Sequence, residues 1–73
     1  MDTSLEQKIT ENLKFEIEHS GKKKQDIAAA IGVKPPTISE YLTGRAQPTL
    51  ANLSRLCSFI GVSADDILEI KKD

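Results

Sequence analysis

Positively charged side chains gather in the middle of this chain of 73 residues. Between residues 20 and 50, only Asp26 and Glu40 oppose five cations, which are Lys22, Lys23, Lys24, Lys34 and Arg45. Residues 1–19 carry the opposite balance, and the whole chain has a net charge of −1. Ammonium and guanidinium groups bind phosphate oxygens, whereas an acidic remainder repels them. The distribution therefore predicts one surface that attracts a polyanion in a single orientation, with modest and salt-sensitive affinity.

The residue types that carry catalysis or hold metals are isolated. His19 is the single histidine and Cys57 the single cysteine, and neither stands in a recognisable spacing with partners. Zinc requires several ligands at set intervals, and a catalytic group requires a residue that activates it. We therefore expect no enzyme, no metal site and no cofactor. Cys57 follows Leu56 in an apolar helical pattern, which indicates a reduced core thiol; an exposed redox-sensing thiol is the alternative.

A short amphipathic helix is predicted over residues 24–31, directly after the three lysines. Ile27, Ala28 and Ile31 put a narrow apolar stripe on one side of it. Gly32 follows the last apolar residue, and glycine readily takes the left-handed conformation that ends a helix. The chain can therefore turn at once into a second element.

That second element is a helix predicted over residues 35–42. Its apolar positions repeat at i, i+3 and i+4, namely Ile38, Tyr41 and Leu42. Pro35 and Pro36 fit its first turn, where a missing N–H removes no helical hydrogen bond. Two helices that bury such stripes against each other across a tight turn form a helix-turn-helix.

The two segments resemble the helix-turn-helix of the phage Cro and repressor (XRE) family. The matching positions are Ile27-Ala28-Ala29-Ala30-Ile31-Gly32-Val33, Thr37-Ile38-Ser39, Gly44-Arg45, Pro48-Thr49 and Gly61-Val62-Ser63. The resemblance covers about residues 9–69 and includes both halves of the motif. It implies an all-α, five-helix lambda-repressor-like DNA-binding domain, with a central helix-turn-helix whose second helix enters the DNA major groove.

Three further helices are predicted around the motif, over about residues 4–19, 49–60 and 64–70, within a single domain of residues 1–73. Two series of apolar residues are expected to face the core: Leu5, Ile9, Leu13 and Ile17 in the first helix, and Leu50, Leu53, Leu56 and Ile60 in the fourth. Thr49 and Ser63 are the expected N-caps of the last two helices. A chain of this length has room for one small core.

The resemblance also implies which side chains meet DNA. Carried over to this chain, they are Lys24, Gln25, Lys34, Pro36, Thr37, Glu40, Thr43 and Arg45. Lys24 and Arg45 are expected to bind phosphates. Lys34 could reach guanine or a phosphate, and Thr37 a base or a phosphate. Glu40 could accept a hydrogen bond from a cytosine amino group, although it would repel nearby phosphates.

Two departures from the family pattern fall near that surface. The family usually has Ser or Thr where Lys23 stands and an apolar residue where Lys22 stands. The first helix of the motif should therefore begin less stably, unless DNA phosphate binds at its amino end. The other departure is the pair Pro35 and Pro36, which cannot hydrogen-bond a base edge. They either touch DNA through apolar contact, for instance with a thymine methyl, or only start the helix.

We therefore expect a sequence-selective transcriptional regulator, a repressor, that binds double-stranded DNA as a homodimer, because one small module makes few base contacts. Candidates for the dimer surface are Phe59, Ile67, Leu68 and Ile70. The alternative is a protein-interaction module on the same fold, for instance an antitoxin or an adaptor that binds a protein partner. The chain has no apolar run of membrane-spanning length and no signal-peptide pattern, which favours the cytoplasm.

Overall fold

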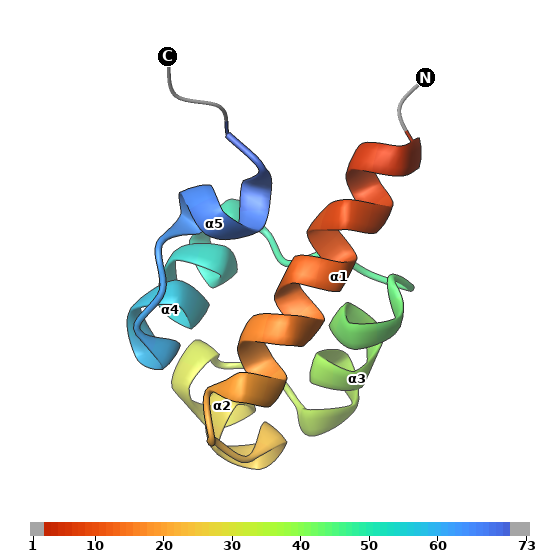
Figure 1. Ribbon diagram of the computed structural model, residues 1–73. Coiled ribbons are helices and arrows are strands. Elements are labelled where there is room, and N and C mark those ends of the chain that lie inside the picture. Colours follow the sequence, from red (N-terminus) through yellow and green to blue (C-terminus); the bar gives the residue numbers. More distant parts are fainter. Residues whose placement is uncertain (1–2, 71–73) are drawn as a thin grey trace.

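The computed structural model describes residues 3–70, with side chains from residue 5 onward. These residues contain five α-helices and no strand. The helices are α1 (Thr3–His19), α2 (Lys24–Ile31), α3 (Pro35–Thr43), α4 (Leu50–Ile60) and α5 (Ala64–Leu68) (Figure 1). The predicted all-α, five-helix architecture is confirmed. Residues 1–2 and 71–73 of the expected domain lie outside the described range.

The helix boundaries differ a little from those predicted. α1 begins at Thr3, one residue early, and α3 continues through Thr43. α4 begins at Leu50 because Thr49 is its N-cap: the Thr49 hydroxyl accepts a hydrogen bond of 3.1 Å from the N–H of Asn52. The predicted cap of α5 is confirmed as well, since the Ser63 hydroxyl accepts a hydrogen bond from a backbone N–H in its first turn.

α5 ends at Leu68, two residues before the predicted end. The side-chain amide of Asn12 in α1 donates to the carbonyl oxygen of Ile67 at 3.1 Å and to Oε2 of Glu69 at 2.7 Å. Glu69 has a φ of 60°, a left-handed conformation that stops the helix. The apolar pattern of residues 64–70 could not reveal this end, because the side chain that fixes it comes from the first helix.

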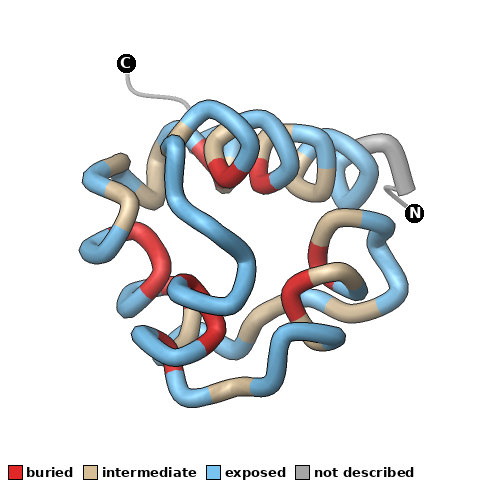
Figure 2. Tube along the Cα trace, turned by 90° about the horizontal axis from the view of Figure 1, so that it is seen from below, coloured by how far each residue is buried: buried red, intermediate tan, exposed pale blue. Residues whose placement is uncertain are grey.

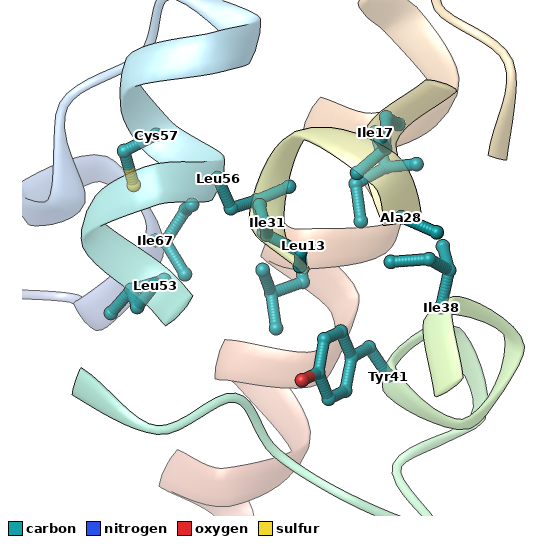
Figure 3. Close-up of a cluster of buried hydrophobic side chains, with 11 residues drawn as sticks. Leu13, Ile17, Ala28, Ile31, Ile38, Tyr41, Leu53, Leu56, Cys57 and Ile67 are labelled. Atoms are coloured by element: carbon teal, nitrogen blue, oxygen red, sulfur yellow. The ribbon is translucent and has the colours of Figure 1, made fainter. Parts of the chain in front are cut away.

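One hydrophobic core receives side chains from all five helices. Its buried members are Leu13, Ile17, Ile27, Ala28, Ile31, Ile38, Tyr41, Leu53, Leu56, Cys57 and Ile67, and Figure 3 shows them converging from the surrounding helices. In Figure 2 the buried stretches face the middle of the molecule, while every helix keeps an exposed outer side. Because burial of each large side chain contributes about 1.5–3 kcal/mol, this core stabilises α2 to α5, which are too short to form alone.

α1 connects the two sides of the bundle, since it contacts α3 along one side and α5 along another (Figure 1). Its predicted apolar stripe is correct in the second half, where Leu13 and Ile17 are buried. Ile9 is half-buried and Leu5 is exposed. The stripe therefore enters the core progressively along the helix.

Leu50 is an error in the predicted core. Its side chain is 82% exposed, whereas Leu53 and Leu56 are buried and Ile60 is half-buried. Leu50 is the first residue of α4. The helical period predicts the direction in which a side chain points, but not whether another element covers the first turn.

Ile67 is wrong as a candidate for a dimer surface, because it is fully buried. Ile67 is apolar because it packs in the core, where α5 contacts α1 and α4, and not because it contacts a second copy of the chain. Phe59 and Ile70 are exposed by 36% and 52%, and Leu68 is half-buried.

Cys57 is a buried free thiol, as the core interpretation predicts. Burial raises its pKa above the usual value, and the nearby Glu16 carboxylate raises it further. A redox-sensing cysteine requires an exposed thiol with a depressed pKa. Cys57 is instead buried, and its pKa is raised, so the redox-sensing alternative is wrong.

Candidate nucleic-acid interface

A tight turn joins α2 to α3. Gly32 ends α2 with a φ of 79°, in the region where the absence of a Cβ avoids a clash. The N–H of Val33 then donates to the carbonyl oxygen of Ala28 at 2.9 Å, and the half-buried Val33 side chain packs against the core. α3 starts at Pro35, so little chain remains between the helices. The turn thus holds the two helices of the motif in a fixed relation.

α3 has a buried side and an open side. Ile38 and Tyr41 are buried in the core, where α3 packs against α1 and α2. Pro36, Glu40 and Thr43 are exposed. A surface helix with one uncovered side is the element that a DNA major groove can admit.

The amino end of α2 carries a cation and free backbone donors. Its N-cap, Lys23, makes no side-chain capping bond, and its carbonyl oxygen accepts from the N–H groups of Asp26 and Ile27 at 3.0 Å. The N–H groups of Lys24 and Gln25 have no acceptor among residues 3–70. Both side chains are exposed. N–H groups at a helix start, together with the helix dipole, suit an anion such as phosphate.

The amino end of α3 offers no such donors. Pro35 and Pro36 have no N–H, and the N–H of Thr37 donates to the carbonyl oxygen of Lys34 at 2.9 Å. The prolines do occupy the first turn, as predicted. Any contact between this helix end and DNA must therefore use side chains, and the prolines can supply only apolar surface.

The eight side chains predicted to meet DNA all reach the surface, seven of them exposed and Thr37 half-buried. They come from the amino end of α2, from α3 with its N-cap, and from the loop that follows α3. At that loop, the carbonyl oxygen of Glu40 accepts from the Arg45 N–H at 3.0 Å and from the Thr43 hydroxyl at 3.2 Å. The Arg45 guanidinium has no ion-pair partner in the described part of the chain. Direct contact with DNA remains a prediction for each of the eight.

Lys22 has a role that the sequence did not reveal. Its Nζ lies 5.0 Å from the centre of the Phe59 ring, in a cation–π contact with α4. Lys22 therefore helps to pack the α1–α2 link against α4. Within the lysine run, Lys24 is the residue at the amino end of α2, as expected.

α1 borders the loop that follows α3. The sequence did not reveal this contact. Thr10 of α1 lies against Gly44, where an added Cβ would stand 3.3 Å from the Thr10 Oγ1. Around this contact is an open hollow that we call the α1–loop hollow; it is lined by Glu6, Gln7, Thr10, Glu11, Thr43, Gly44, Arg45, Ala46 and Gln47. Two carboxylates thus border the loop that carries Arg45. The charges of α1 resemble an ordinary solvated helix face in the sequence, so no motif marked them.

Residues 13–67, most of the chain, match a model of the helix-turn-helix family. The chain belongs to the XRE-type helix-turn-helix family. This family consists of DNA-binding transcriptional regulators, and the assignment confirms the resemblance predicted from the motif.

Two known proteins are similar to this helix-turn-helix protein over most of its length. It is 34% identical over 62 residues to the HTH-type transcriptional regulator DdrOP3 of Deinococcus deserti, an alignment that covers 85% of this chain and 48% of the relative. The solution structure of the SOS-response transcriptional repressor LexA from Eubacterium rectale matches it with a TM-score of 0.80 and 30% identity, covering 94% of this chain and 73% of that one. The chain therefore spans about half the length of the curated relative.

Membership of this helix-turn-helix family agrees with the prediction that the chain is not an enzyme, since the family acts by binding DNA. Within residues 3–70, no group of three or more His, Cys, Asp or Glu side chains is placed to hold a metal ion. In the same range, no helix has the length and apolar character needed to cross a membrane.

Proposed function

We propose that this chain is a single DNA-binding domain of residues 1–73, a sequence-selective transcriptional repressor that acts in the cytoplasm and inserts α3 into the major groove. The observation that carries the proposal is the division of α3 into a core side, with Ile38 and Tyr41, and an uncovered side, with Pro36, Glu40 and Thr43. Similarity to a LexA described as an SOS-response transcriptional repressor supports the repressor role.

Phosphate contacts at two helix ends flank α3 in this proposal. At one, the exposed Lys24 lies beside the free N–H groups at the start of α2. At the other, Arg45 precedes α4, where the Thr49 cap leaves the N–H groups of Leu50 and Ala51 without an acceptor among residues 3–70. Backbone N–H groups and cations bind phosphates without regard to sequence. These contacts fix the position of α3 on the duplex.

Base recognition in the proposal depends on few side chains. Lys34 and Thr37 act at the start of α3, where Lys34 donates to guanine or a phosphate and the Thr37 hydroxyl binds a base or a phosphate. Pro36 adds apolar contact with a thymine methyl, and Glu40 accepts from a cytosine amino group. Gln25 and Thr43 extend the polar edge of this surface. A single copy therefore reads few base pairs.

Because one copy reads little sequence, the proposal includes a homodimer that binds two half-sites about one helical turn apart. With Ile67 in the core, the remaining candidates for the dimer surface are Phe59, Leu68 and Ile70. A copy tethered to a second copy by a flexible linker should bind a two-half-site duplex more tightly than the free chain does.

Fluorescence anisotropy with labelled duplexes, first of random and then of selected sequence, tests the proposal. Changing Lys24, Lys34 or Arg45 to alanine should weaken binding, and each lost phosphate contact should reduce the slope of log affinity against log salt by about 1. Lys14→Ala is the matched control, because Lys14 is an exposed cation on α1 outside the α1–loop hollow. An absence of binding at low salt, for the wild type and the tethered dimer alike, would overturn the proposal.

A protein-interaction module is the second candidate, and the chemistry of α3 favours it. Pro35 and Pro36 are exposed apolar residues, and the exposed carboxylate of Glu40 would repel a phosphate placed next to it. A protein partner with a cationic and apolar surface would suit these groups. A stoichiometric complex with one protein, together with indifference to DNA, would favour this candidate over the repressor.

A further inference from the structure

Four polar residues of α1 lie on one side of that helix, directly across from the loop that carries Arg45. The spacing of Glu6, Gln7, Thr10 and Glu11 places them on a common helical face, and all four line the α1–loop hollow. The opposite wall is formed by residues 43–47. Two acidic residues and one arginine therefore line the same hollow.

No cation of the described chain is paired with these carboxylates. Glu6 and Glu11 are exposed, and neither has an ion-pair partner within residues 3–70. Lys8, the cation between them in the sequence, is directed toward α5, where its Nζ lies 3.8 Å from Oε1 of Glu69. Arg45 does not neutralise them either, since no ion pair joins it to α1. A phosphate that approaches Arg45 thus also approaches two unpaired negative charges.

The loop has little freedom to move Arg45 away from α1. Thr10 lies so near Gly44 that a Cβ added to this glycine would stand 3.3 Å from the Thr10 Oγ1. The N–H of Arg45 donates to the carbonyl oxygen of Glu40 at 3.0 Å, which ties the start of the loop to the end of α3. The backbone at Arg45 is therefore held next to α1 by the fold, and Arg45 lines the same hollow as Glu6 and Glu11.

We propose that Glu6 and Glu11 limit the affinity of this protein for DNA by repelling the phosphate that Arg45 binds. This inference rests on the proposed function. Like charges at the rim of one surface hollow repel one another, and a modest repulsion is enough to change a binding constant severalfold. Since phosphate contacts supply most non-specific affinity, the two carboxylates reduce binding to DNA of any sequence.

Anisotropy with a labelled duplex of about 21 bp, two helical turns, tests the inference. Glu6→Gln and Glu11→Gln should each tighten binding about threefold, and the double variant about tenfold, at low salt. The gain should shrink as salt rises, because screening removes the repulsion. In an Arg45→Gln background, the double change should tighten binding less than about twofold, since no phosphate is then held at the hollow.

Asp66→Asn is the control, because it also removes one exposed negative charge but lies on α5, away from the hollow. It should change affinity less than about 1.5-fold. Equal gains for Asp66→Asn and Glu11→Gln, or a gain that persists without Arg45, would overturn the inference and indicate a general effect of net charge. Failure of both the wild type and the double variant to bind any duplex would instead contradict the proposed function, and the inference would fall with it. Thermal unfolding of each variant confirms that the fold is retained.

Discussion

The carboxylate of Glu69 lies 2.7 Å from the side-chain amide of Asn12, and this hydrogen bond fastens the last helix of the described chain to the first. The same amide donates to the carbonyl oxygen of Ile67, one of the acceptors that the end of a helix leaves without a partner. Lys8 also approaches Glu69, at 3.8 Å, but that ion pair is exposed and therefore weak. Asn12 thus keeps α5 in place over the core.

Asn12→Ala should lower the free energy of unfolding by about 1–2 kcal/mol, because it removes two hydrogen bonds and leaves a partly buried carbonyl unpaired. Lys8→Ala, which removes only the exposed ion pair, should lower it by less than about 0.5 kcal/mol. Urea denaturation followed by circular dichroism measures both. Equal effects of the two changes would show that the hydrogen bonds of Asn12 do not hold α5.

Gly44 and Gly21 provide a matched pair, because both have a positive φ, of 79° and 75°, but only Gly44 has a neighbour where a Cβ would be added. Alanine at either site should lower the free energy of unfolding by about 1 kcal/mol through backbone strain. Gly44→Ala should be the more damaging because the methyl group also presses on Thr10. In a Thr10→Ala background its effect should fall to that of Gly21→Ala. An unchanged difference between the two glycines would contradict the contact.

The exposure of Leu50 predicts an unusual order of stability effects. Ile38→Val removes one methylene from a fully buried side chain and should lower the free energy of unfolding by about 0.5–1.5 kcal/mol. Leu50→Ala removes far more apolar surface, but from a side chain that is 82% exposed, and should change stability by less than about 0.5 kcal/mol. Thermal unfolding compares the two. A larger loss for Leu50→Ala would mean that Leu50 is buried in solution.

The raised pKa of Cys57 predicts a loss of stability in alkaline solution. Burial, with help from Glu16, favours the protonated thiol in the folded chain, so the folded state holds its proton to a higher pH than the unfolded state does. The free energy of unfolding should therefore fall as pH rises above the pKa of the unfolded thiol. Cys57→Ala should make this fall shallower. A thiol reagent should also react slowly with the folded wild type, and rapid labelling would contradict burial.

Local sequence signals predicted the motif well. The stripes of α2 and α3, the glycine between them and the caps Thr49 and Ser63 were all predicted from residues close together in the chain, and each lies where expected. Such features depend on neighbouring residues, whose spacing the sequence displays directly.

Features that depend on distant residues could not be predicted. The end of α5 is fixed by Asn12, the direction of Lys22 by the Phe59 ring, and the surroundings of Arg45 by α1. The prediction that Leu50 is buried was wrong for a related reason, since a helical period gives no information about which element packs against that side of the helix. The eight residues predicted to contact DNA reach the surface, and their contact with DNA stays a prediction.

In the proposed function, the outer side of α3, the amino end of α2 and the loop at Arg45 form one DNA-binding surface. Titration of the isotopically labelled chain with duplex DNA, followed by the chemical shifts of its backbone amides, maps the residues of this surface. We predict the largest changes at Lys24, Gln25, Thr37, Glu40 and Arg45, and small changes throughout α5. Changes centred on α5 or on the second half of α1, with α3 unaffected, would contradict the account.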